Sequence, residues 1–261
     1  SISFGLWREP MKSAASRYNS PLTGSGSCRR TLGDLVAGLL LTMGMAVATW
    51  WLLGLPATYL LTALIIYATM ALLVVVSVPA DLPGPGLGPA NRVTLGRAAL
   101  AIPVVALCVP PIPLGILGSW WVIFLGTTVM ILDGVDGAVA RRTRSQSAFG
   151  ARFDMEFDAA LIMALAVLVW VTGRAGAWCL LIGLMRYVFL AAGWILPQLR
   201  AELPESYRRK VVCVVQGVVL LIALGPIIPD LMAVVVVATG LALLLYSFSV
   251  DVLWALMNSG R

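Results

Sequence analysis

Long apolar runs separated by short polar segments constrain this chain more than any other feature. A helix of about 20 apolar residues is long enough to cross the hydrocarbon core of a membrane. Hydrophobic residues make up 60% of the chain and charged residues 11%, whereas a soluble domain averages about 25% charged residues. The sequence therefore predicts an all-α, polytopic membrane bundle. We expect about eight spans, at residues 35–53, 57–78, 92–110, 114–132, 156–172, 176–196, 210–228 and 231–257.

The basic residues predict the orientation of this bundle. With the N-terminus in the cytoplasm, 16 of the 18 Lys and Arg residues fall in cytoplasmic segments, and Arg174 and Arg186 are the exceptions. An excess of Lys and Arg is typical of cytoplasmic loops in membrane proteins. We therefore interpret residues 1–34 as a cytoplasmic tail. The net charge of +6 then reflects membrane topology, and we expect no nucleic-acid partner.

Four aspartates lie in the polar segment between the fourth and fifth predicted spans. Asp133 and Asp136 are three residues apart and share one face of a helix, while Asp154 and Asp158 are four apart and share a face of the next. Carboxylates at a membrane edge need cations to neutralise them, and Mg²⁺ and Mn²⁺ prefer oxygen ligands. The chain has no histidine, so metal binding and proton transfer both depend on carboxylates. Four aspartates offer enough oxygens for a pair of ions.

Other residues in the same segment suit a phosphate-bearing ligand. Gly137 and Gly150 present no side chain, so a nucleotide or a second helix can approach closely. Arg141 can hold a phosphate through two parallel hydrogen bonds. The alternative is a salt-bridge network at the surface, in which the acids pair with Arg141, Arg142, Arg144 and Arg152. That alternative explains neither the two glycines nor the spacing of the acids.

The complete pattern D-x-x-D-G-x-x-A-R-x8-G-x3-D-x3-D, from 133 to 158, resembles the signature of the CDP-alcohol phosphotransferase (CDP-alcohol phosphatidyltransferase) family. Residues 89–97 resemble the family's first core helix, Pro-Asn-x-x-Thr-x-x-Arg, with Ala90 as an interruption. The resemblance implies a six-helix core over residues 89–257. Residues 35–78 then form an additional N-terminal transmembrane hairpin.

The resemblance also implies roles for individual residues. It assigns Asp133, Asp136 and Asp154 to metal binding and makes Asp158 both a metal ligand and the catalytic base. It implies a nucleotide site formed by Asn91, Thr94, Gly137, Ala140, Arg141 and Gly150. Asn91 is equally compatible with an ordinary helix N-cap. The family further suggests a homodimer, and we expect a bacterial inner membrane as the location.

The acceptor side is less well determined by the sequence. Arg186 lies within a predicted span, where a charge normally faces a cavity or a partner. With Arg209 and Lys210 it could bind an anionic acceptor. The alternative for Arg186 is that its charged end snorkels to the membrane surface. The alternative for Arg209 and Lys210 is that they only reflect the orientation of the chain in the membrane. A family pattern, Lys-x-Lys-Thr-x-x-Gln, is only partly kept between Lys210 and Gln216, which puts a glycerol-phosphate type of acceptor in doubt.

These features together predict an enzyme of phospholipid biosynthesis. We expect Mg²⁺- or Mn²⁺-dependent transfer of a phosphatidyl group from CDP-diacylglycerol to a small polar alcohol, with release of CMP. Transfer from CDP-choline or CDP-ethanolamine to diacylglycerol is the alternative within the family. An intramembrane prenyltransferase would need two separated Asp-rich motifs, and a transporter would need acids along a mid-membrane path. Serine, inositol phosphate, glycerol phosphate and choline all remain open as acceptors.

Overall fold

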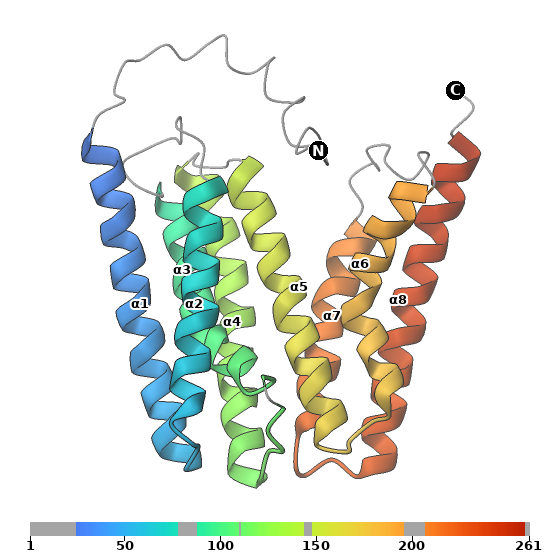
Figure 1. The fold of residues 1–261 in the computed structure, drawn as a ribbon. Coiled ribbons are helices and arrows are strands. Elements are labelled where there is room, and N and C mark those ends of the chain that lie inside the picture. Colours follow the sequence, from blue (N-terminus) through green and yellow to red (C-terminus); the bar gives the residue numbers. More distant parts are fainter. Residues whose placement is uncertain (1–24, 78–87, 110, 144–147, 196–206, 259–261) are drawn as a thin grey trace.

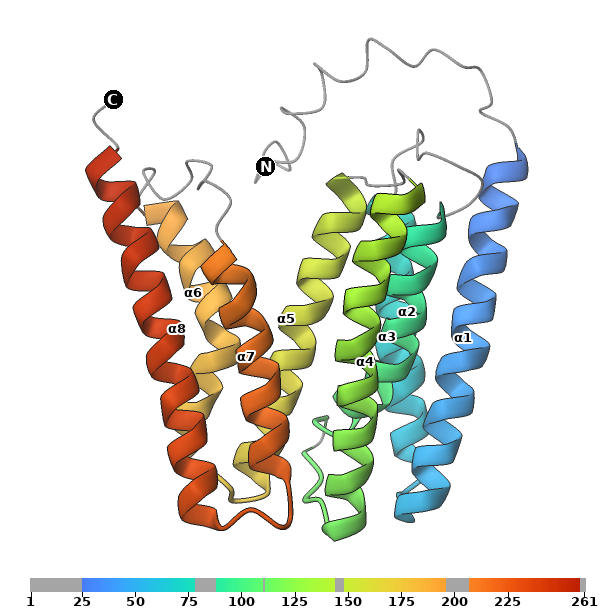
Figure 2. The ribbon, with the colours of Figure 1, turned by 180° about the vertical axis from the view of Figure 1, so that it is seen from behind.

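The computed structural model describes residues 25–77, 88–109, 111–143, 148–195 and 207–258, and these form one helical bundle without strands (Figures 1 and 2). This confirms the predicted all-α class and the number of eight helices. The helices of the described residues are α1 (Ser25–Leu53), α2 (Thr58–Ser77), α3 (Gly88–Ala106), α4 (Ile116–Thr143), α5 (Ala148–Val171), α6 (Leu180–Ile195), α7 (Tyr207–Leu224) and α8 (Asp230–Asn258).

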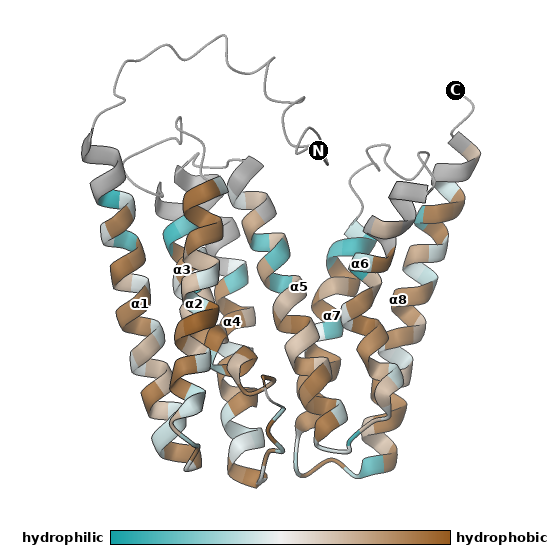
Figure 3. Ribbon diagram, in the orientation of Figure 1, coloured by the Kyte–Doolittle hydropathy of each residue, from teal (hydrophilic) through white to brown (hydrophobic). Residues whose placement is uncertain are grey.

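The outer surface of the bundle is apolar. Large side chains such as Trp51, Val76 and Ile131 are between 66% and 79% exposed, and Figure 3 shows hydrophobic residues along most of each helix. Four segments are long and apolar enough to cross a membrane: Arg30–Leu53, Thr58–Ser77, Ile116–Gly134 and Asp230–Trp254. The other helices are shorter or carry more charge.

Two helices extend well beyond the apolar runs from which they were predicted. Helix α4 continues past the expected end at 132 to Thr143, and α5 begins at Ala148 instead of 156. The aspartate motif therefore lies on the adjoining ends of two consecutive helices, as its spacing predicts. We call this end of the bundle the motif end, and the other the opposite end. Helix α3 also begins at the motif end (Figure 1).

Helix α3 begins at Gly88, four residues before the expected boundary at 92. Residues 79–90 are rich in Pro and Gly, which predicts no helix there, yet residues 88–90 are helical. The second residue of α3 is Pro89, and proline is tolerated in the first turn because the N–H groups there have no partner within the helix. Asn91 is thus already inside the helix, which contradicts its interpretation as an N-cap.

The N-terminal hairpin of α1 and α2 packs against α3 and α4. The Tyr59 hydroxyl donates to the carbonyl of Pro103 over 2.9 Å, and Trp121 Nε1 donates to Thr49 Oγ1 over 2.9 Å. At Gly38 a Cβ atom would lie 2.7 Å from the Tyr67 hydroxyl, so glycine permits the close approach of α1 and α2. The two hydrogen bonds join the hairpin to the core near the turn between α1 and α2.

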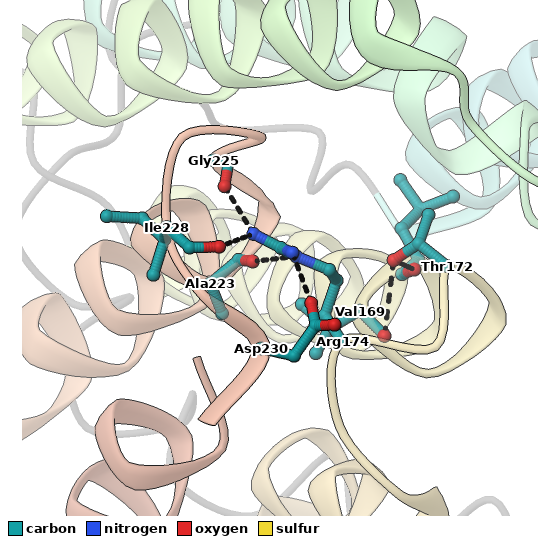
Figure 4. Close-up of polar contacts among 8 residues, drawn as sticks. Val169, Thr172, Arg174, Ala223, Gly225, Ile228 and Asp230 are labelled. Atoms are coloured by element: carbon teal, nitrogen blue, oxygen red, sulfur yellow. Dashed lines mark hydrogen bonds and ion pairs between the residues drawn. The ribbon is translucent and has the colours of Figure 1, made fainter. Parts of the chain in front are cut away.

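Arg174 joins two loops at the opposite end of the bundle (Figure 4). Its Nε donates to the carbonyl of Ala223 over 2.9 Å, and its Nη2 donates to the carbonyls of Gly225 and, over 2.6 Å, Ile228. Its Nη1 contacts Asp230 Oδ1 at 2.6 Å. The guanidinium thereby donates to carbonyls at the end of α7 and in the loop before α8, where helix ends leave such groups without intrahelical partners.

Candidate functional site

A buried arginine lies among three of the predicted aspartates at the motif end. Arg97 of α3 is 1% exposed, and its Nη2 lies 2.9 Å from Asp133 Oδ1 and 2.7 Å from Asp158 Oδ1. Its Nη1 lies 2.5 Å from Asp154 Oδ1. The guanidinium also lies over the ring of Phe157, 5.5 Å from the centroid. One side chain of α3 therefore connects the carboxylates of α4 and α5.

The packing of three helices explains why these groups meet. Asp154 and Asp158 are one turn apart on α5 and share a face, and α3 packs against both α4 and α5. The three aspartate side chains are each between 29% and 37% exposed. They are thus open enough for a ligand to reach, while the arginine that connects them is inaccessible.

A cavity of about 60 Å³ adjoins this cluster. Asp133, Asp158 and Arg97 form its polar wall, and α7 contributes Cys213 and Gly217. The remaining lining residues are apolar, so the cavity has one polar wall within an otherwise hydrophobic environment. Of the two aspartates of α5, Asp158 is the one that lines the cavity, which suits the role of a group that meets a substrate hydroxyl.

The carboxylates fit a divalent cation. Asp133, Asp154 and Asp158 can each direct one oxygen so that the three atoms lie within 4.8 Å of one another. Among the described residues of this cluster, three carboxylates face one guanidinium, so an excess of negative charge remains. Carboxylate oxygens are the ligands that Mg²⁺ and Mn²⁺ prefer. Both the donor set and the net charge therefore suit a hard divalent ion.

The predicted nucleotide-binding residues divide into two groups. Asn91 and Thr94 are buried at 5% and 4% exposure and lie on the α3 face that also carries Arg97, at intervals of three residues. Gly150 lies in the first turn of α5 and is partly exposed. The remaining predicted residues follow Asp133 on α4, and their side chains lie outside the described residues: Asp136, Gly137, Ala140 and Arg141.

Arg186 forms an ion pair that the sequence did not indicate. Its Nη2 lies 2.5 Å from Glu156 Oε1, and the two side chains are 26% and 54% exposed. Close packing of α6 on α5 supports this contact, because a Cβ atom on Gly183 would lie only 2.7 Å from the Cα atom of Met163. The charge of Arg186 is therefore balanced by Glu156.

The basic residues at the start of α7 have different surroundings. Arg208 donates to the carbonyl of Ser247 over 2.7 Å and lies 2.5 Å from Asp251 Oδ1, so it joins α7 to α8. Arg209 is partly buried and Lys210 is exposed, both in the first turn of α7. Their role in binding an acceptor stays a prediction.

Gln216, the last residue of the partly kept family pattern, is an internal structural contact between α7 and α8. It is 2% exposed, and its Nε2 donates to the carbonyl of Gly240 over 3.0 Å. A Cβ atom on Gly240 would lie 3.3 Å from Gln216 Oε1, so the Cα–H of that glycine faces the amide oxygen. Its contacts are those of helix packing.

Arg97 is the site residue that sequence reasoning missed. We had placed it in a cytoplasmic segment and attributed its charge to membrane topology. The signal that could have identified it is the spacing of Asn91, Thr94 and Arg97, which are three residues apart and share a helix face. The salt-bridge alternative for the acids also named different arginines, and Arg152 and the three arginines after Ala140 lie outside the described side chains.

The comparison with known families agrees with this geometry. A sequence model of the CDP-alcohol phosphatidyltransferase family matches residues 87–246, more than half of the chain. This region begins with α3 and contains every residue of the cluster. No curated protein and no solved structure matches the chain. The family is generally metal-dependent, in agreement with the three-carboxylate cluster. The chain is an integral membrane protein that belongs to the CDP-alcohol phosphatidyltransferase family, the transferases of lipid synthesis.

Proposed function

We propose that this enzyme transfers a phosphatidyl group from CDP-diacylglycerol to a small polar alcohol and releases CMP, with Mg²⁺ or Mn²⁺ as the cofactor. The observation that carries the proposal is the excess of negative charge in the cluster of Asp133, Asp154 and Asp158, within the region that matches the family. A CDP-linked donor carries a pyrophosphate, which carboxylates alone would repel. Divalent ions between the two resolve this repulsion.

We assign different residues to metal binding and to nucleotide binding. Asp133, Asp154 and Asp158, with Asp136 of the same motif, would hold one or two cations, and these supply charge neutralisation for the pyrophosphate. The buried polar groups of Asn91 and Thr94 on α3 favour a nucleotide beside the cluster. We assign the rest of the nucleotide site to Gly137, Ala140, Arg141 and Gly150.

Asp158 is the residue we propose as the general base. It lines the cavity, and the chain has no histidine that could take this role. The carboxylate accepts the proton of the acceptor hydroxyl, and the oxygen attacks the phosphorus that bears the diacylglycerol. A new phosphorus–oxygen bond forms to the acceptor, and the bond between this phosphorus and the oxygen of the CMP group breaks. CMP leaves with that electron pair.

We place the active site at the cytoplasmic face of a bacterial inner membrane, on the basis of the distribution of Lys and Arg. Arg186, a charge within a predicted span, would meet a polar acceptor together with Arg209 and Lys210. Because Arg186 pairs with Glu156, its electrostatic attraction for an anionic acceptor is weaker. A homodimer is proposed from the family resemblance.

The test is an assay of the purified protein with CDP-diacylglycerol, Mn²⁺ and a panel of acceptors: serine, glycerol phosphate, inositol phosphate and choline. We expect CMP and one new phospholipid to form with one acceptor. CDP-choline with diacylglycerol serves as the second donor arm. Absence of CMP with every donor and acceptor would contradict the proposal.

The variant Asp158→Asn tests the base. We expect a loss of CMP release of about 100- to 10,000-fold, the usual contribution of a general base. Asp230→Asn is the matched control, because it removes an acid at the opposite end of the bundle and should keep the activity. Near wild-type turnover of the folded Asp158→Asn variant would rule out this role for Asp158.

A further inference from the structure

Arg97 is a fully buried cation among the carboxylates that we propose as metal ligands. We propose that Arg97 is an internal counter-ion of this site, which holds the carboxylates together in the metal-free protein and competes with the divalent cation for their oxygens. The inference rests on the proposed metal dependence. Arg97 lies outside the aspartate motif of residues 133–158, and the inference gives it a positioning role.

The contacts of Arg97 fit a counter-ion for the whole cluster. One nitrogen, Nη2, contacts Asp133 of α4 and Asp158 of α5, while Nη1 contacts Asp154. The rigid fork of a guanidinium is suited to bridging several carboxylates, whereas an ammonium is a compact point charge. The ring of Phe157 lies against the same guanidinium and helps to fix its position.

The charge balance explains why such a group is needed. The oxygens of three carboxylates come within 4.8 Å of one another, and their mutual repulsion opposes folding unless a cation lies nearby. Arg97 supplies one positive charge, which lessens this repulsion, and the described carboxylates still outnumber it. The folded protein can therefore assemble its metal site before a metal arrives and still attract a divalent ion.

Arg97 and a bound cation would compete because both interact with the same three carboxylates. Arg97 contacts the Oδ1 atom of each aspartate, and each aspartate offers one oxygen to the candidate metal group. A bound cation would share these carboxylates with a guanidinium of the same sign of charge. Arg97 should thus weaken metal binding while it stabilises the protein without metal.

The experiment measures two quantities in the full chain: Mn²⁺ binding by electron paramagnetic resonance, and the unfolding temperature with and without Mn²⁺. For Arg97→Gln we expect Mn²⁺ to bind about tenfold more tightly than in the wild type. We expect its unfolding temperature to fall by roughly 10 °C without metal, and most of that loss to be recovered with saturating Mn²⁺. Arg97→Lys keeps the charge and should show a smaller change of the same kind.

Arg174→Gln is the matched control, because Arg174 also joins helices through several contacts but faces one carboxylate. Its loss of stability should be the same with and without Mn²⁺. An equal loss under both conditions for the Arg97 variants would overturn the inference and leave Arg97 as a purely structural residue. Weaker Mn²⁺ binding by both variants would also overturn it. If Arg97→Gln does not fold even with Mn²⁺, the stability and Mn²⁺ binding of Arg97→Lys decide whether the inference holds.

The proposed function and this inference can fail separately. Wild-type protein that releases CMP with Mn²⁺ supports the function whatever the Arg97 variants do. Arg97 variants that lose the same stability with and without Mn²⁺ then contradict the counter-ion role alone. Wild-type protein that binds no Mn²⁺ contradicts both.

Discussion

Arg97 and Arg174 perform comparable tasks at opposite ends of the bundle, and the groups around them differ in one decisive respect. Arg97 faces three carboxylates, so the described residues of its cluster keep an excess of negative charge. Arg174 faces one carboxylate and three backbone carbonyls, so its surroundings are neutral overall (Figure 4). Both arginines join helices, but the first cluster has charge left for a ligand and the second has none.

This difference gives a physical criterion for separating a site from a structural contact in a membrane bundle. A buried charge needs partners both in a ligand site and in a structural contact, so burial alone does not distinguish the two. The balance of charge among the partners does distinguish the two ends. The variants below test this criterion, and they are described from the largest expected effect to the smallest.

The largest effect is expected for Asp133→Asn. The substitution removes one of three carboxylates that face Arg97, and with it a proposed metal ligand. We expect CMP release to fall at least about 100-fold, because metal ions contribute several kcal/mol to such reactions. The fold should survive, since Arg97 keeps two carboxylate partners. The assay is CMP release at saturating and limiting Mn²⁺, and activity that is unchanged at both would break the comparison.

Arg174→Gln should affect stability instead. It removes a donor to the carbonyls of Ala223, Gly225 and Ile228, of which Gly225 still accepts from the N–H of Ile228. Each carbonyl left without a partner costs about 1–3 kcal/mol when it is buried. We expect a loss of roughly 3 kcal/mol in the free energy of unfolding, with the specific activity of the folded protein unchanged. A marked drop in activity without loss of stability would show that the opposite end does more than join loops.

The pair of Arg208 and Asp251 provides an intermediate case. Asp251 is 13% exposed and Arg208 28%. Asp251→Asn should destabilise the protein by about 1–2 kcal/mol, since the charged hydrogen bond is partly buried. The KM for the acceptor should stay at its wild-type value, because Arg208 is a contact between α7 and α8. A large rise in this KM would instead place Arg208 in the acceptor site.

Asp34→Asn is expected to have the smallest effect. Asp34 Oδ1 lies 3.0 Å from Arg92 Nε, and the Arg92 side chain is 47% exposed. Exposed ion pairs contribute about 0–1 kcal/mol, so the melting temperature should change little. The pair connects the N-terminal hairpin to α3 at the motif end. A loss of activity larger than tenfold would show that the hairpin positions the site.

The sequence was sufficient for the parts of the molecule that depend on local pattern. Apolar runs predicted the eight helices, and the spacing of the aspartates predicted that Asp133 on one helix and Asp154 and Asp158 on the next would meet. The boundaries were less accurate, since α4 and α5 continue as helices beyond their apolar residues. Hydropathy indicates which part of a helix lies in an apolar environment, but it does not show where the helix ends.

The contacts of Arg97 and Arg186 were not predicted, and the reason is physical. An arginine in a helix can pair with any acid that tertiary packing brings near, and the partners here lie between 30 and 61 residues away in sequence. Glu156 was not singled out as a partner, although it lies between Asp154 and Asp158 on the same helix. Its position on α5 turns it away from the other two acids and toward α6.

The most direct test of the central claim is CMP release from CDP-diacylglycerol while Mn²⁺ is added, removed with a chelator and added again. We expect no release without the metal, release with it in the presence of a suitable acceptor, and full recovery once the metal exceeds the chelator. The same rate of CMP release in excess chelator would contradict the assignment of the three-carboxylate cluster as a metal site.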